Sequence, residues 1–344
     1  MGAEIKTETP VTSLITDEAG KVIGVVAQDG SQTINVKANL CVVLGTGGFD
    51  HNPAMLAAHQ AIPVYVTNAV IGCTGDGQIM AGAIGADMAN MDTNWGLPSF
   101  YPEPFDPHAE AFYDMVFPDW GIARAGAGSI VVNKRGKRFA NEASSYAVFN
   151  RAYGNYATDT LEYLNIPAVF ICDDNYAKSG PLQGQGSLDN PIPDNYFQAD
   201  TLREIADHFG IDAAGLEAEV SAFNKNAATG VDIDFQRGEK QGDLAIGAYR
   251  PYFSELENPV LAPLDTPPFY ASLYVPGTCG TNGGIKTNEF AQALNTRGEV
   301  IEGLYAVGNC SASITGGQYC GAGMTVGAGA VMSWVAIRKA LGLM

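Results

Sequence analysis

The chain has 344 residues, and 46% of them are hydrophobic, which is enough apolar material for one large domain or two ordinary ones. Its 37 acidic and 19 basic residues give a formal net charge of −18, and this field disfavours nucleic acid and anionic membrane surfaces as partners. No apolar run reaches the roughly 18 residues of a membrane span, and the N-terminus lacks a secretory leader pattern, so we expect a cytoplasmic protein.

The first third of the chain predicts a small antiparallel meander followed by a buried strand. Residues 11–16, 22–28 and 32–37 are rich in β-forming residues and are separated by turn sequences. Residues 40–44 form a short apolar run suited to a parallel strand, and this run ends in the glycine-rich residues 45–48. A strand that ends in glycines marks the edge of an α/β sheet where ligands bind.

The last part of the chain predicts a strand, a loop and a closing helix. Residues 303–307 form a second apolar strand, which ends in Gly308 and Asn309, and we expect the two glycine-bearing strand ends to meet at one site. A glycine-dense segment, 316–329, then leads into an apolar stretch that ends at residue 344. Such glycine density lets the backbone approach a flat or phosphorylated ligand, although a tight loop packed on protein is the alternative.

Between these strands the pattern changes, and apolar residues recur at helical spacing over 200–226. We predict that residues 88–268 form an inserted lobe, and that 1–87 and 269–344 form one discontinuous domain. The six cysteines are scattered without a Cys-x-x-Cys pair or a histidine cluster, so we expect reduced thiols and no metal site.

Several motifs occur in an order that resembles one flavoprotein superfamily, that of fumarate reductase and 3-oxosteroid dehydrogenase. They are residues 9–12 (Thr-Pro-Val-Thr), 47–53 (Gly-Gly-Phe-Asp-His-Asn-Pro), 74–77 (Thr-Gly-Asp-Gly), 128–133 (Gly-Ser-Ile-Val-Val-Asn), 136–142 (Gly-Lys-Arg-Phe-Ala-Asn-Glu) and the glycine-rich tail. The chain is most similar to the 3-oxosteroid dehydrogenase branch, through Arg124 and Gly128-Ser129, residues 141–146, and residues 267–272 leading into 280–284.

The resemblance implies an α/β fold: an incomplete Rossmann-like FAD-binding domain with an inserted α+β substrate-capping domain. It implies FAD as the cofactor, held from the two strand ends and from the N-terminus of the final helix, whose dipole stabilises negative charge on a reduced flavin. The expected cofactor-binding residues are Thr46, Gly47, Gly48, Asp76, Gly308, Asn309, Gly323, Met324, Thr325 and Val326. For Asp76, capping of a turn is an equally good explanation.

The implied chemistry is transfer of two hydrogens at a carbon–carbon bond next to a ketone. It needs a donor to the ketone oxygen, a base for the neighbouring proton, and the flavin as hydride partner. By position in the family pattern, Tyr146 is the proton-transfer residue and Tyr270 binds the carbonyl, with Ser272 assisting from the same face of an extended segment. Both tyrosines also have a purely structural explanation. Trp95, Tyr101 and Tyr319 are candidates for an apolar substrate pocket, or for packed core.

Two departures from the family pattern shape the functional hypothesis. The histidine and the tail arginine with which the fumarate reductase branch binds dicarboxylates are absent, so we expect a small apolar, steroid-like ketone as the substrate. The GxGxxG segment and its acidic residue do not occur before Thr9. This leaves open a truncated chain, a second chain that supplies the missing half, or altered FAD binding. A fumarate-reductase-like enoate reductase and a non-catalytic half-site fragment are the alternative functions.

Overall fold

The structure is a computed structural model that describes residues 2–108, 117–183, 193–247 and 255–344. The chain forms two compact units, each discontinuous in sequence. Unit 1 comprises Met1–Ala61, Ala69–Trp95 and Cys279–Met344, and unit 2 comprises Ile62–Asn68 and Gly96–Thr278. The inserted lobe that the sequence indicates over residues 88–268 remains a prediction.

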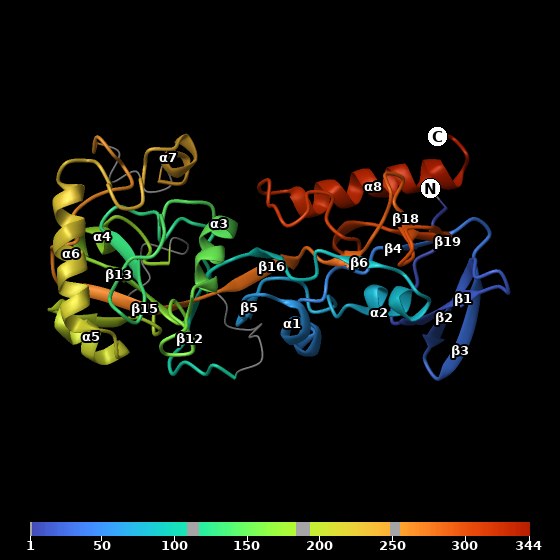
Figure 1. The fold of residues 1–344 in the computed structure, drawn as a ribbon, viewed down its shortest axis with the longest axis horizontal. Coiled ribbons are helices and arrows are strands. Elements are labelled where there is room, and N and C mark those ends of the chain that lie inside the picture. The colour runs from blue at the N-terminus through green and yellow to red at the C-terminus, as the bar shows by residue number, and fades with distance from the viewer. Residues whose placement is uncertain (1, 109–116, 184–192, 248–254) are drawn as a thin grey trace. The chain divides into compact units, whose positions relative to one another are not determined.

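Unit 1 begins with the antiparallel meander of β1 (Val11–Thr16), β2 (Val22–Asp29) and β3 (Gln32–Lys37), which confirms the three strands expected from the sequence (Figure 1). The carboxylate of Asp17 accepts two backbone N–H bonds of 3.0 Å, which closes the turn between the first two strands. The hairpin turns are local signals, and they sufficed to place these strands.

The two glycine-bearing strands are parallel neighbours, as expected. β4 (Val42–Leu44) pairs with β19 (Val300–Ala306), and β18 (Gln292–Leu294) adds an antiparallel strand on the other side of β19. The first of these strands is shorter than predicted: Leu40 is 61% exposed and lies before the paired residues. Continuous apolar sequence therefore overstated the length of the buried strand.

Both faces of this small sheet are covered. The closing helix α8 (Met324–Ala340) lies over one face (Figure 1). There Ala336 and Met332 of the helix pack beside Tyr305 and Val307. The other face lies against α2 (Asp76–Ala83) and the meander. Covering on both faces is what a parallel strand pair needs. The remaining elements of unit 1 are α1 (Pro53–His59), β6 (Met88–Ala89), β7 (Asn94–Gly96, which runs into unit 2), β17 (Gly284–Ile285) and η3 (Gly308–Cys310).

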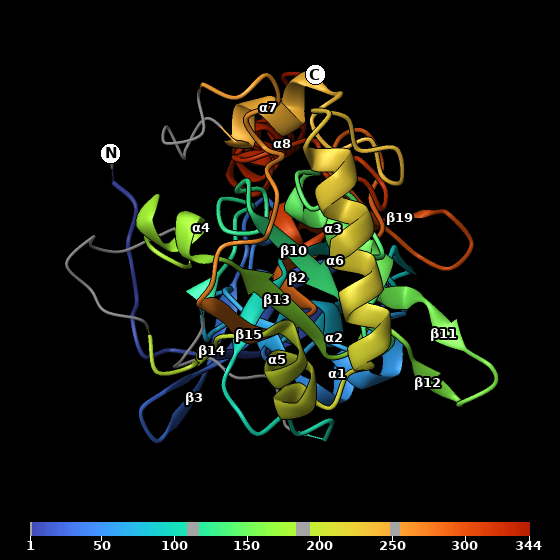
Figure 2. The same cartoon turned by 90° about the vertical axis from the view of Figure 1, so that its left-hand side faces the viewer.

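Unit 2 is built on an antiparallel sheet in the order β10-β13-β15-β8-β9, with β14 also paired to β15. The bounds are β8 (Ser99–Tyr101), β9 (Phe117–Pro118), β10 (Ser129–Val132), β13 (Ala168–Cys172), β14 (Phe197–Ala199) and β15 (Phe269–Val275). Two helices, α5 (Leu202–Phe209) and α6 (Ala213–Ala227), lie over this sheet (Figure 2) and share its hydrophobic core. They confirm the helical pattern expected over 200–226 and divide it at Gly210, whose φ of +65° ends α5.

Shorter elements complete unit 2. They are β5 (Val66–Thr67), α3 (Tyr146–Arg151), η1 (Ala152–Gly154), β11 (Tyr156–Ala157), β12 (Glu162–Tyr163), α4 (Asp174–Lys178), α7 (Gln241–Gly247) and the start of β16 (Gly277–Thr281), which continues into unit 1. β5 pairs in parallel with the first two residues of β16. The sheet and its helices thus provide a rigid support for α3, where a predicted catalytic tyrosine lies.

Candidate functional site

The loops that follow β4 and β19 are joined by one buried side chain in unit 1. Gln78 of α2 is 2% exposed, and its amide donates hydrogen bonds to the carbonyls of Gly47 (3.1 Å) and Asn309 (3.2 Å). The hydroxyl of Thr46 likewise donates to Cys310 Sγ (3.4 Å). The structure therefore brings the predicted residues of the two strand ends together. Sequence reasoning missed Gln78, although it directly follows the Thr-Gly-Asp-Gly motif.

The glycines of unit 1 serve two different purposes. A Cβ at Gly48 would collide with Thr281 Oγ1, and one at Gly77 with Thr46 Oγ1, so these glycines allow protein to pack closely against protein. In the tail, Gly316, Gly321 and Gly323 have φ of +63°, +128° and +88° with open space beside the missing Cβ. The tail therefore needs glycine for its backbone path, and that path leaves room beside it.

A small hollow, with a free volume of about 10 Å³, lies between α8, η3 and the segment after β16. Its lining includes Trp95, Thr281, Asn282, Gly308, Asn309, Ser311, Ser313, Ile314, Ala328 and Met332. The indole N–H of Trp95 and the amide oxygen of Asn282 are buried and have no hydrogen-bond partner within the part of the chain that the structure describes. A buried donor and a buried acceptor beside a hollow favour a polar ligand that satisfies both.

The N-terminus of α8 supports the same ligand chemistry. The helix begins at Met324 after Gly323, and no side chain caps its first turn. The N–H of Met324 donates to the carbonyl of Gly321 (3.3 Å), whereas the next N–H groups of this turn and the positive end of the helix dipole are available to negative charge. Thr325 is half-buried and Val326 is 76% exposed, so the predicted residues of this turn lie at the surface of unit 1. Asp76 is exposed in the first turn of α2, where it favours that helix.

Two of the predicted tyrosines lie in accessible positions. Tyr146 is the first residue of α3 in unit 2, is half-buried, and meets Trp120 edge to face with ring centroids 5.4 Å apart. Tyr319 lies in the glycine tail of unit 1, is half-buried, and packs against Trp95 with centroids 5.9 Å apart. Each ring is held by an aromatic neighbour while part of it stays open to solvent.

The other predicted residues of unit 2 are buried. Tyr270 lies within β15 between two strands and is 7% exposed; burial, and then the charge of Asp174, raise the pKa of its phenol. Ser272, two residues along, is fully buried and accepts a 3.1 Å hydrogen bond from Asn195, a partner that the sequence did not reveal. Tyr101 is 2% exposed, and burial followed by Asp106 raises its pKa.

Another tyrosine of β15, Tyr274, has a structural role. It is fully buried in β15, its hydroxyl donates a 2.8 Å hydrogen bond to Asp119, and burial raises its pKa well above the ordinary value. The same carboxylate accepts the backbone N–H groups of Gly121 and Ala123. Tyr274 therefore helps to fix the loop that leads to β10.

The family model described as "FAD binding domain" matches residues 1–326. The chain belongs to this FAD-binding domain family. The resemblance drawn from the sequence motifs is thereby confirmed, together with the expected fold class. Within the described residues, no helix of this FAD-binding protein is long and apolar enough to cross a membrane.

The curated relatives of this FAD-binding chain include dehydrogenases of cyclic ketones. It is 35% identical over 334 residues to 4-oxocyclohexanecarboxylate 2-dehydrogenase of Sinomonas cyclohexanicum, which covers 95% of this chain and 55% of the relative. It is 33% identical over 359 residues to 3-oxosteroid 1-dehydrogenase of Mycolicibacterium smegmatis, covering 97% of this chain and 58% of the relative. The chain thus spans little more than half the length of these relatives.

A solved structure supports the same relationship. The 3-ketosteroid delta1-dehydrogenase of Sterolibacterium denitrificans, in complex with 1,4-androstadiene-3,17-dione, superposes with a TM-score of 0.86 at 33% identity. The match covers 98% of this chain and 59% of that chain. The unpaired donor and acceptor, the uncapped start of α8 and the open space beside the glycine tail are compatible with the isoalloxazine end of FAD, so the residues present fit the family's cofactor.

Proposed function

We propose that this chain is the flavin-facing and substrate-capping part of an FAD-dependent oxidoreductase that acts on a carbon–carbon bond next to a ring ketone. The observation that carries the proposal is the start of α8, which is uncapped and follows a glycine tail whose backbone leaves open space. The dehydrogenase relatives support the reaction class. When bound, FAD supplies the hydride acceptor for such a reaction.

The residues of unit 1 would hold the planar end of the cofactor. Trp95 and Asn282 offer one hydrogen-bond donor and one acceptor, and the N-terminus of α8 offers backbone N–H groups toward developing negative charge. Gly308 and Asn309 line the same hollow. Thr46, Gly47 and Gly48 support it from the neighbouring strand end, through Gln78 and Thr281.

The residues of unit 2 would handle the proton. Tyr146 is assigned as the group that removes the proton beside the ketone, because its hydroxyl-bearing ring is held by Trp120 and is partly open. For the donor to the ketone oxygen, the sequence pattern indicates Tyr270, with Ser272 assisting. The low exposure of Tyr270 makes Tyr319 a competing assignment, since a donor must reach the oxygen to within hydrogen-bond distance.

The proposed substrate is a neutral, steroid-like ring ketone. The relatives' names include both an oxosteroid and a small oxocyclohexane carboxylate. A net charge of −18 disfavours the carboxylate, because the summed field repels an anion. The alternative activity is reduction of an enoate. The alternative assembly is a half-site that a second chain completes. The cytoplasmic location stays a prediction.

Turnover by the FAD-loaded chain tests the proposed function. With a 3-oxosteroid and an artificial electron acceptor, we expect the ultraviolet band of a newly conjugated ketone to appear. The same assay with 4-oxocyclohexanecarboxylate is the charge control, and we expect it to be slower. A flavin-loaded protein that converts neither ketone, yet reduces an unsaturated acid when given a reduced donor, would replace this proposal with the enoate reductase.

A further inference from the structure

The segment before Tyr146 is held by a buried arginine of unit 2. Arg124 is fully buried, and its guanidinium donates 2.9 Å hydrogen bonds to the carbonyls of Glu142 and Ser144. The same guanidinium lies over the ring of Phe149 in α3, 5.0 Å from its centroid. Arg124 thus contacts the chain on both sides of Tyr146, at two carbonyls before it and at one ring after it.

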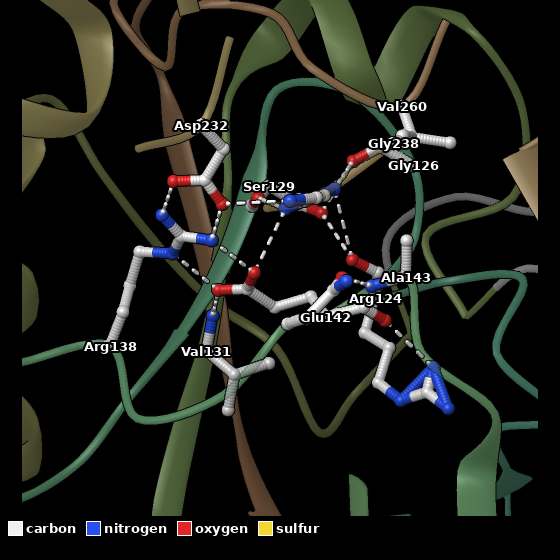
Figure 3. A network of polar contacts seen from close by, with 12 residues as sticks. Arg124, Gly126, Ser129, Val131, Arg138, Glu142, Ala143, Asp232, Gly238 and Val260 are labelled. Atoms are coloured by element: carbon white, nitrogen blue, oxygen red, sulfur yellow. Dashed lines mark hydrogen bonds and ion pairs between the residues drawn. The ribbon is translucent and has the colours of Figure 1, made fainter. Parts of the chain in front are cut away.

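The other end of this segment is fixed by a network of buried charges (Figure 3). The carboxylate of Glu142 accepts hydrogen bonds from Arg138 (2.8 and 2.6 Å) and from the backbone N–H of Val131 in β10 (3.3 Å). Arg138 in turn is paired with Asp232 at 3.1 and 2.8 Å. Glu142 is therefore held on its side chain by several hydrogen bonds, and Arg124 binds its carbonyl.

Arg124 is itself held on its backbone. Its N–H donates to Asp119 (3.1 Å), and its carbonyl accepts from Arg237 (3.1 Å). A guanidinium has donors in a fixed planar arrangement, so it can hold two carbonyls at once, whereas an ammonium is a point donor. The arrangement is suited to fixing a backbone rather than to giving up a proton.

We propose that Arg124 is a positioning residue for Tyr146: by binding the carbonyls of Glu142 and Ser144, it sets the start of α3 and hence the direction of the tyrosine ring. This inference rests on the proposed role of Tyr146 in proton transfer. This positioning role differs from that of an arginine that donates a proton, because the guanidinium of Arg124 donates its hydrogen bonds to backbone carbonyls. A displacement of a catalytic group by about 1 Å can cost on the order of 100-fold in rate.

A double-mutant cycle tests the proposal. In the FAD-loaded chain we expect Arg124→Lys to lower kcat about 10-fold and to leave KM within about twofold of its original value. In a Tyr146→Phe background, we expect the same substitution to lower kcat less than about twofold. The control is Arg203→Lys, on an exposed ion pair of α5, which should change neither parameter. Equal losses in the two backgrounds would overturn the proposal, since Arg124 would then act independently of Tyr146.

A second measurement needs no turnover. The chain has 3 tryptophans, which can be labelled with ¹⁹F and observed by NMR. The signal of Trp120 is assigned by its loss in Trp120→Phe. Its chemical shift senses the ring of Tyr146, which packs beside it. We expect Arg124→Lys to move this signal and Arg203→Lys to leave it in place; an unmoved signal contradicts the positioning role. If Arg124→Lys does not fold, Arg124→Gln is measured with the same outcomes. Full activity in Tyr146→Phe would instead reject the proposed role of Tyr146 in proton transfer, and the ¹⁹F result would still decide the role of Arg124.

Discussion

Replacing Tyr146 with phenylalanine should lower turnover of a ring ketone by the FAD-loaded chain by about 100-fold or more, which is the usual scale for a lost general base. The variant keeps the ring that packs edge to face on Trp120 and removes only the hydroxyl. Binding of the ketone should change little, so the loss should appear in kcat rather than in KM. Steady-state kinetics with one ketone and one acceptor measure both.

The matched control for Tyr146 is Tyr156→Phe. Tyr156 lies in the same unit, is 48% exposed, and donates its hydroxyl to the carbonyl of Leu161. It should leave kcat within about twofold, because it has no proposed part in the reaction. If Tyr146→Phe and Tyr156→Phe behaved alike, Tyr146 would be a structural tyrosine.

Replacing Asp232 with alanine should destabilise unit 2 by about 3–5 kcal/mol, the scale for removing one partner of a buried ion pair. Asp232 and Arg138 have fully buried side chains and are joined by two hydrogen bonds. Loss of the carboxylate would leave Arg138 with the buried partner Glu142 and with unpaired N–H groups. Urea unfolding monitored by circular dichroism measures the change in the free energy of unfolding.

The control for Asp232 is an exposed pair in the same unit, Arg135 with Asp159 at 2.8 Å. Asp159→Ala should cost less than about 1 kcal/mol, because exposed pairs are screened by solvent. Equal costs for the two variants would show that the buried network does not stabilise unit 2.

The same network predicts how stability depends on pH. Burial disfavours the charged form of Asp232, but its hydrogen bonds and charge interaction with Arg138 outweigh this and hold the pKa of the carboxyl below its ordinary value. A depressed carboxyl pKa contributes stability above the unfolded pKa of about 3.9, and this contribution is lost as pH falls through the folded pKa. Unit 2 should therefore lose stability below about pH 4, and Asp232→Asn should flatten that loss.

Local patterns in the sequence predicted much of the fold. Hairpin turns predicted the meander, and apolar runs that end in glycine predicted that the ends of β4 and β19 meet. Two residues illustrate the limit of such patterns. Gln78 joins loops that end at Gly47 and Asn309, and Asp232 reaches Arg138 across 94 positions. The spacing of residues in a single sequence does not reveal hydrogen bonds between such distant positions.

The candidate site shows the same limit for single residue types. The sequence predicted that Gly48 binds the cofactor, yet a neighbouring side chain requires glycine at this position, and only the structure shows what a Cβ would meet there. The segment 267–272 placed Tyr270 in an extended strand, but pairing on both sides buries it. Residue type predicted the chemistry, and burial decides which residues are accessible for it.

Flavin binding by the purified chain tests the central claim most directly. We expect titration with FAD to produce a saturable change in the flavin absorption bands, and we expect the change to weaken in an Asn282→Leu variant, which lacks the buried acceptor of the hollow. A chain that keeps no flavin absorption after unbound FAD has been removed would contradict the claim that these residues hold the flavin.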